Sequence, residues 1–315
     1  MTAYLIRRIA TSILVILGVS IFIFFLLHTI YPSPAQDILG AKATQSAVNS
    51  WNKQHGFDSP WIVQYGRYLW NLLHGNLGYS YKLNQPVTSL FAGRWMRSLY
   101  LSGISLLFAL IIAIPLGIYQ AARRNSIGDN VVTSLAFTTY AMPSFFLALV
   151  LIQVFALSFP IFSYEASQST SVLVVMGDWH AMTLPIATLT LLSVAGFSRY
   201  MRSTAIDTLA QDFIKAARAK GLPERLVLLR HLLRNASLPM VTLVGLSIPA
   251  LLAGNLITEE VFNYPGLGLL FFQSLNNVDY NVLLAYTLIG ATLTVVGNLV
   301  ADLALTAADP RIRLA

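Results

Sequence analysis

Five stretches of this sequence run for membrane length without a charged residue, at positions 9–30, 98–122, 130–164, 236–258 and 280–301. A helix needs roughly 20 apolar residues to cross the hydrocarbon core of a bilayer. The chain is 56% hydrophobic and only 10% charged, whereas soluble proteins average about 25% charged residues. A large soluble core does not account for uncharged runs of this length, so the sequence predicts an integral membrane protein.

The uncharged runs and their flanks predict six crossing helices, near 9–30, 98–121, 132–158, 181–199, 236–258 and 282–306. The third run exceeds one crossing, which predicts a kink at Pro143 and an exit from the membrane at Pro160. The first run is too long for the apolar part of a signal peptide, and no small-residue cleavage site follows it. We therefore expect the first helix to be retained.

The distribution of lysine and arginine predicts the orientation, because cytoplasmic segments carry an excess of both. With six spans, 14 of the 20 Lys and Arg residues fall on the side of the two termini. The other six lie in one long loop: Lys42, Lys53, Arg67, Lys82, Arg94 and Arg97. Both termini are therefore expected in the cytoplasm. This topology also explains the net charge of +7 without a nucleic-acid patch, because the basic segment lacks interleaved aromatic residues.

The long loop contains the sequence "SPWIVQYGRYLWNLLHG", which reads as a helix. Ser59 is the predicted N-cap, Pro60 the first helical position and Gly75 the residue after the last turn. Aromatic and apolar residues recur at helical spacing along it: Trp61, Tyr65, Leu69 and Leu72. We interpret it as a helix on the outer rim of the membrane rather than as a ligand site.

A basic segment, "DFIKAARAKGLPERLVLLRHLLRNASLP", separates the fourth and fifth predicted spans. Asp212 is predicted to cap a first short helix, and Gly221 suits a left-handed residue at its end. Pro223 is predicted to start a second, amphipathic helix lying on the cytoplasmic leaflet. Its predicted apolar face consists of four leucines: Leu222, Leu226, Leu229 and Leu233.

Small residues in the first short helix leave one face with little side-chain bulk: Ala216, Ala217 and Ala219. Such a face lets another backbone approach closely, which makes it a candidate docking surface. The alternative is an ordinary surface helix, because alanine is the best helix former.

These residues resemble a known family. "KAARAKG" followed by "RHLLRNASLP" is similar to the EAA-type cytoplasmic loop of ABC importer permeases, in particular of the dipeptide and oligopeptide branch. Lys215 stands where the general pattern has glutamate, and the spacing from Gly221 to Pro239 is longer than in that pattern. Both departures fit the peptide branch. Further segments that resemble the family occur in order along the chain: "YLIRRI", "HGNLGYSY", "IPLGIYQAARRNSIGD", "YAMPSFFLALVLI", "EEVFNYPGLGLLFFQSL" and "ADPRIRLA".

The resemblance implies an all-α integral membrane protein of six transmembrane helices. A long extracytoplasmic loop would follow the first helix, and a cytoplasmic coupling helix would lie between the fourth and fifth. The implied divisions are an N-terminal helix at 1–30, the extracytoplasmic loop with its interfacial helix at 31–97, an importer core at 98–306 with a coupling loop at 203–235, and a cytoplasmic tail at 307–315.

The same resemblance implies the partners and the sites. Expected partners are a second permease subunit that is a paralogue of this chain, two ATPase subunits or domains that carry ATP and Mg²⁺, an extracytoplasmic solute-binding protein and membrane lipid. The protein is expected in a bacterial plasma membrane. The expected ATPase-docking residues are Asp212, Phe213, Ala216, Ala217, Lys220 and Gly221. The outer-gate candidates are Glu259, Glu260, Pro265 and Gly266.

The motif content disfavours enzymatic chemistry in this chain. It has no GxxxxGK[ST] phosphate loop, no HExxH metal pair, no GxSxG nucleophile and no cysteine. We therefore expect no catalytic residues, no metal site and no bound cofactor. Two ionisable candidates lie within the spans. His28 is interpreted as an interfacial side chain, and Asp302 as a group that reaches the headgroups or pairs with a neighbouring span. A gradient-driven secondary transporter remains the alternative, and the cargo is left open among dipeptides, oligopeptides, glutathione-like molecules, nickel chelates and sugars.

Overall fold

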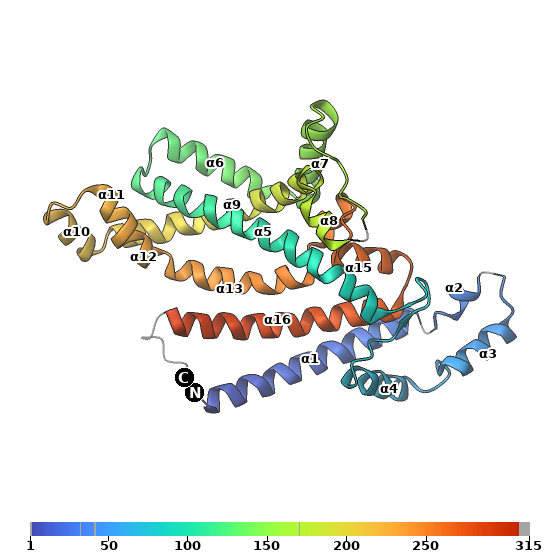
Figure 1. Cartoon of the computed structure of the whole chain (residues 1–315). Coiled ribbons are helices and arrows are strands. Elements are labelled where there is room, and N and C mark those ends of the chain that lie inside the picture. Colours follow the sequence, from blue (N-terminus) through green and yellow to red (C-terminus); the bar gives the residue numbers. More distant parts are fainter. Residues whose placement is uncertain (1, 32, 41, 170, 309–315) are drawn as a thin grey trace.

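The computed structural model describes residues 2–31, 33–40, 42–169 and 171–308, and it is mostly helical. Five long helices form the bundle: α1 (Thr2–Ile30), α5 (Val87–Ala122), α9 (Trp179–Leu209), α13 (Leu238–Ala253) and α16 (Tyr280–Ala308). Helix α5 packs on α9, α13 packs on α16, and α1 packs on α16 (Figure 1). Four of them, all but α13, contain a stretch long and apolar enough to cross a membrane within the described residues.

The third predicted span is divided at Pro143. It comprises α6 (Ile127–Ala141), α7 (Ser144–Ile152) and the π-helical η1 (Gln153–Ser158). The second part is bent by 107° relative to the first, and α7 rises away from α6 in Figure 1. Proline lacks an N–H and pushes the preceding residue into extended geometry, as seen at Met142 with ψ 133°. The predicted kink is therefore present, and it is so sharp that it divides the segment into two separate helices, α6 and α7.

Two helices extend well beyond the predicted spans. Helix α5 begins at Val87 rather than near residue 98, and Val87, Leu90 and Phe91 are buried against the region of α15 and α16. Helix α9 continues from 199 to Leu209, because its last turns pack against the segment that follows. Tertiary packing thus prolongs both helices outside the apolar runs.

The segment between α1 and α5 contains three helices and a hairpin: α2 (Ala35–Leu39), α3 (Gln45–His55), α4 (Trp61–Leu73), β1 (Tyr79–Ser80) and β2 (Gln85–Pro86). The predicted rim helix is α4, and Gly75 follows it with a φ of +75°. The predicted N-cap was wrong. Pro60 occupies that position, and no side chain caps the helix. The Ser20 hydroxyl of α1 lies 2.7 Å from the Tyr65 hydroxyl, which joins α4 to α1.

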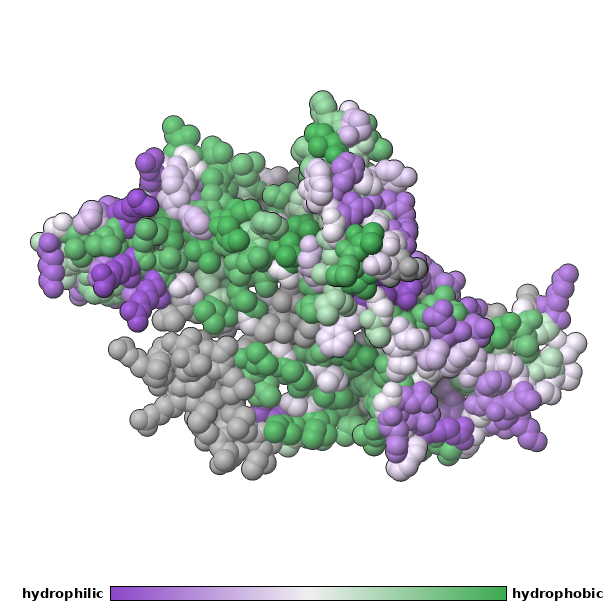
Figure 2. Space-filling model, in the orientation of Figure 1, coloured by the Kyte–Doolittle hydropathy of each residue, from purple (hydrophilic) through white to green (hydrophobic). Residues whose placement is uncertain are grey.

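The remaining helices are short. They are α8 (Val172–Gly177), α10 (Asp212–Ala219), α11 (Glu224–Leu226), the π-helical η2 (Val227–Leu232), α12 (Leu233–Ala236), α14 (Leu256–Val261) and α15 (Leu267–Asn276). In Figure 1 the first turn of α1 and the last turn of α16 lie toward the α10 end of the bundle, and α2–α4 lie at the opposite end. Figure 2 shows an apolar band between two more polar ends, which is the surface expected of a chain that spans a membrane.

Candidate functional site

Helix α10 forms one extremity of the molecule (Figure 1). It begins at Asp212, but Gln211 holds the N-cap position and no side chain caps the helix. The predicted capping role of Asp212 is therefore wrong. Asp212 occupies the first turn, where its carboxylate accepts a 2.9 Å hydrogen bond from Lys215 Nζ. Its negative charge interacts favourably with the positive end of the helix dipole.

The predicted docking residues of α10 divide into two faces. Phe213 is 42% exposed, and Asp212, Ala216, Lys220 and Gly221 are exposed as well. Ala217 is only 5% exposed, because it faces the chain's own interior rather than a partner. The surface of α10 that another protein can reach therefore carries an aromatic ring beside a small residue and a lysine.

A buried apolar cluster connects α10 to the bundle. Ile214 and Ala217 of α10 pack with Met201 and Ala205 of α9, and with Ala121 at the end of α5. Val227, Leu232, Ala236 and Met240 complete the cluster. Close-packed interiors transmit displacement instead of absorbing it. A force applied to α10 would therefore reach α5, α9 and α13 together.

The turn after α10 is built as predicted at Gly221, which has a φ of +76°. Arg218 spans this turn and donates hydrogen bonds of 3.1 and 2.6 Å to the Glu224 carboxylate. These bonds raise the pKa of Arg218 above its ordinary value. The pair is half exposed, so it fixes geometry more than it adds stability.

The predicted leucine face of the second helix was only partly right, because Leu222 and Leu233 pack against the apolar cluster and the other two leucines do not. Leu226 and Leu229 are exposed, whereas Val227 and Leu232 are fully buried. The reason is the π-helical stretch from Val227 to Leu232, which has more residues per turn than an α-helix. The extra residue shifts the buried positions, so a spacing of 3.6 residues selects the wrong side chains.

At the far end of the bundle, the fifth predicted span is interrupted. Helix α13 ends at Ala253, and Gly254 follows with a φ of +88°. The chain then folds back through α14 and α15. Glu259, predicted as an outer-gate residue, is fully buried.

The Glu259 carboxylate is held by four donors. Oε1 accepts hydrogen bonds from Ser98 Oγ at 2.8 Å and from the Asn255 N–H at 3.1 Å. Oε2 accepts from the N–H groups of Gly268 at 2.7 Å and Leu269 at 3.2 Å. These four hydrogen bonds tie α5, α14 and α15 together.

The other outer-gate candidates surround this carboxylate. A Cβ at position 266 would come within 2.3 Å of Glu259 Oε2, so only glycine fits there. The Pro265 carbonyl accepts a 3.2 Å hydrogen bond from Arg97. Glu260 differs from its neighbour, since its buried Oε2 has no hydrogen-bond partner among the described residues.

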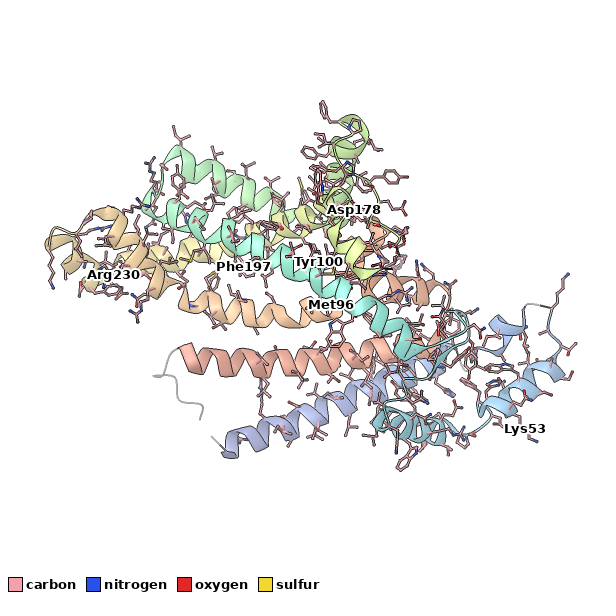
Figure 3. The ribbon with its side chains drawn as sticks, viewed as in Figure 1. Lys53, Met96, Tyr100, Asp178, Phe197 and Arg230 are labelled. Atoms are coloured by element: carbon pink, nitrogen blue, oxygen red, sulfur yellow. The ribbon has the colours of Figure 1, made fainter. Side chains whose placement is uncertain are left out.

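A groove of about 490 Å³ runs between α5, α9 and α13. Its polar lining consists of hydroxyl and amide side chains: Ser102, Ser105, Ser193, Ser247 and Asn255. Phe197, labelled in Figure 3, and Tyr200 add aromatic surface. No charged side chain is among the described residues that line it. Asn255 donates a 2.7 Å hydrogen bond to Ser102 and so joins the groove to the Glu259 loop.

Comparison with known proteins identifies the chain. Residues 113–314 match the family described as "Binding-protein-dependent transport system inner membrane component", and residues 1–102 match the corresponding N-terminal family. The chain belongs to this family. It is 37% identical over 314 residues to the oligopeptide transport system permease protein AppB of Bacillus subtilis (strain 168), covering 99% of both chains. It is 34% identical over 313 residues to the glutathione transport system permease protein GsiC of Escherichia coli (strain K12), again covering 99% of both.

This membership confirms the resemblance of the chain to ABC importer permeases and favours an importer over a gradient-driven transporter. The protein is a multi-pass, all-α membrane permease. Its family is a transport component rather than an ATPase.

Several residues of this permease were missed from the sequence. Ser98 and Arg97 hold the Glu259 loop, and Asn255 connects that loop to the groove. Ser98 and Glu259 lie 161 positions apart, so no local pattern joins them. Of the two ionisable span residues, His28 stacks on Phe24, and the side chain of Asp302 lies outside the described ones.

Proposed function

We propose that this permease forms half of the translocation path of an ATP-driven importer for short peptides. The observation that carries the proposal is α10, which holds Phe213 exposed at one end of the molecule while Ile214 anchors the helix in the bundle. The cargo class is inferred from the oligopeptide and glutathione permeases that resemble the chain.

The proposed assembly places two ATPase subunits or domains, with their ATP and Mg²⁺, against α10 on the cytoplasmic side. A second permease, a paralogue of this chain, would complete the path, and an extracytoplasmic binding protein would deliver the cargo. Closure of the ATPase pair would pull α10, and the cluster around Ile214 would pass the movement to α9 and α13. The groove between them would then open alternately to each side.

The groove suits a peptide chemically. Hydroxyl and amide groups such as Ser102, Ser193 and Asn255 can donate to and accept from peptide N–H and C=O groups. Their neutral character places no fixed charge in the path, so peptides with different side chains could pass. Glu260, Pro265 and Gly266 are the residues we assign to the outer gate beside it.

The proposed topology has six crossings in a bacterial plasma membrane: α1, α5, the bent α6–η1 segment, α9, α13 with α14, and α16. Helix α13 has 16 residues, about 24 Å at 1.5 Å per residue. This is less than the roughly 30 Å hydrocarbon core. The folded-back α14 would supply the remaining depth, with its backbone buried in protein as such segments require.

Uptake into proteoliposomes tests the proposal. The assembled complex is reconstituted with its ATPase subunits facing inward, with ATP inside and the binding protein and radiolabelled glutathione or tri-alanine outside. Phe213→Ala should reduce ATP-dependent uptake at least tenfold, a loss of about 1.4 kcal/mol in coupling. Phe22→Ala on α1, at a phenylalanine that is 63% exposed, is the matched control and should transport normally.

Two results would contradict the proposal. One is uptake that continues without ATP when a proton or sodium gradient is imposed. The other is normal uptake by Phe213→Ala in a complex shown to be fully assembled.

A further inference from the structure

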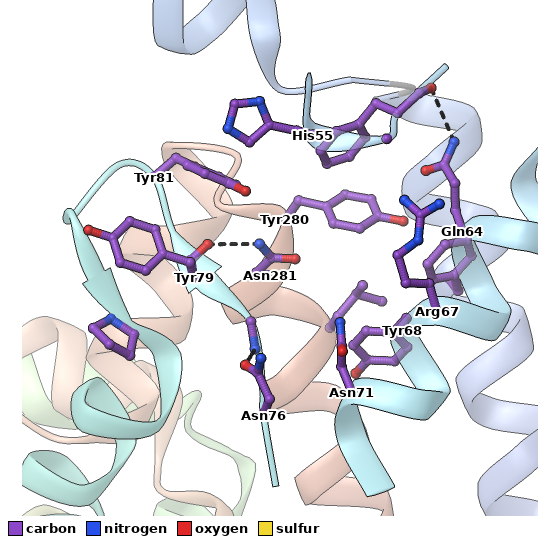
Figure 4. A pocket seen from close by; sticks show the side chains of 16 residues that line it. His55, Gln64, Arg67, Tyr68, Asn71, Asn76, Tyr79, Tyr81, Tyr280 and Asn281 are labelled. Atoms are coloured by element: carbon purple, nitrogen blue, oxygen red, sulfur yellow. Dashed lines mark hydrogen bonds between the residues drawn. The ribbon is translucent and has the colours of Figure 1, made fainter. Parts of the chain in front are cut away.

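A second cavity lies at the α3 end of the molecule, away from the groove. Its volume is about 480 Å³, within the range of roughly 300–1,000 Å³ that small-molecule sites occupy. It is enclosed by α4, the β1–β2 hairpin and the first turn of α16 (Figure 4). Much of its wall is aromatic: Phe24, His55, Phe57, Tyr79 and Tyr81.

Two phenol hydroxyls in this cavity are buried without a hydrogen-bond partner among the described residues, those of Tyr68 and Tyr280. Tyr280 is only 6% exposed. A buried hydroxyl that makes no hydrogen bond is unfavourable, because it has lost its hydrogen bonds to water. Burial also raises the pKa of Tyr68, so this hydroxyl keeps its proton at neutral pH and remains a donor.

Arg67 adds a positive charge to the same cavity. Its guanidinium lies against Gly56, where a Cβ would come within 1.9 Å of Nη1, so the glycine leaves room for it. None of the described residues that line the cavity is an aspartate or glutamate. Figure 4 shows the Arg67 guanidinium and the Tyr280 hydroxyl on the same side of the cavity. The Arg67 guanidinium is therefore a positive charge with no carboxylate among the described residues that line the cavity.

We propose that this cavity binds a small molecule with a carboxylate and an apolar or aromatic group, of about the size of an amino acid or a short peptide. Arg67 would bind the carboxylate through its planar fork, and Tyr280 would donate to the same group. The aromatic wall would cover the apolar part. The topology proposed above would open this cavity to the outside of the cell. The binding itself does not depend on that topology.

Isothermal titration of the full-length permease in detergent micelles tests this site. The probe is N-acetyl-L-phenylalanine, and N-acetyl-L-phenylalaninamide is the matched ligand without a carboxylate. We expect saturable binding of the acid and at least tenfold weaker binding of the amide. Arg67→Gln should weaken binding of the acid at least tenfold, whereas Arg67→Lys should keep part of it.

Two variants separate binding from folding. Tyr280→Phe removes one hydroxyl and keeps the ring against Phe24 and Phe57, so it should bind several-fold more weakly with an unchanged elution profile. Lys53→Gln removes an exposed charge on α3 outside the cavity and should bind as the parent does. Any of three results would overturn the proposal. They are equal binding of acid and amide, binding of inorganic phosphate in place of the acid, and an unchanged affinity in both Arg67→Gln and Tyr280→Phe. A failure of uptake in the proteoliposome assay would leave this binding result unaffected.

Discussion

Glu259 is a buried carboxylate that accepts hydrogen bonds from four donors among the described residues. Glu259→Gln keeps the shape but places an NH₂ group against donors, so it should lower the free energy of unfolding by roughly 2–4 kcal/mol. Thermal unfolding of the purified permease in detergent measures this change.

The adjacent glutamate provides the control for that experiment. Glu260 Oε2 makes no hydrogen bond among the described residues, so Glu260→Gln should leave the stability unchanged or slightly raised. Equal losses in both variants would show that the hydrogen bonds of Glu259 are not responsible.

The backbone conformation of single residues could be predicted from the sequence, but their burial could not always be. The left-handed turn at Gly221 and the break at Pro143 could be predicted, because backbone conformation depends on the residue itself. The burial of Glu259 could not, since its partner Ser98 is distant in sequence. A pair of adjacent glutamates beside an apolar run looks solvated until the fold brings donors to one of them.

At the level of helices, the crossing of α5 and α9 depends on Gly117. A Cβ there would lie 2.7 Å from the Met201 Cβ, 2.8 Å from the Ser198 carbonyl oxygen and 2.9 Å from the Arg202 nitrogen. Because two of these atoms are backbone, Gly117→Ala should force the helices apart and destabilise the protein by about 1–3 kcal/mol. Chemical denaturation in mixed micelles measures the loss.

Gly93 is the matched control on the same helix, because nothing lies within 4 Å of a Cβ there. Gly93→Ala should be neutral or stabilising by about 0.5–1 kcal/mol, as expected from helix propensity. A loss in both variants would indicate that the effect does not arise from the α5–α9 crossing.

Hydrophobic periodicity predicted some of the helical elements correctly and failed for others. It predicted the long helices and the rim helix α4, because an apolar stripe on an α-helix repeats regularly. It failed at Leu226 and Leu229, since η2 has π-helical geometry. It also missed the start of α5 at Val87, where burial against α15 and α16 continues a helix through a stretch that is not membrane-like.

For the whole molecule, the proposed orientation predicts opposite accessibility of its two ends. The chain has no cysteine, so a single introduced cysteine is the only target of a maleimide. Lys53 and Arg230 are exposed and lie near opposite ends in Figure 3. In intact cells a membrane-impermeant maleimide should label Lys53→Cys and leave Arg230→Cys unmodified.

Inside-out vesicles should reverse this pattern and serve as the control for reactivity. Labelling of Arg230→Cys in intact cells would contradict the cytoplasmic position of α10 and, with it, the proposed ATPase contact.

The overall organisation was largely predictable because it follows from a few strong constraints. Uncharged runs set the helices, and the Lys and Arg distribution predicts their direction. In Figure 1 the first turn of α1 lies toward the same end of the bundle as α10. The polar cavity around Tyr280 was not predictable, because its walls come from α1, α4, the hairpin and α16.

Helix α5 runs without interruption from the buried Val87 near the hairpin to Ala121 in the cluster around Ile214. It contains one proline, Pro115, whose missing N–H removes a backbone hydrogen bond and makes that turn the least stiff. Bending between the two surfaces of the membrane is therefore concentrated within one turn of the Gly117 crossing. The long portion before Pro115 would move as a rigid unit. In the proposed assembly, binding-protein docking outside and ATP hydrolysis inside would therefore both bend α5 at the turn that contains Pro115.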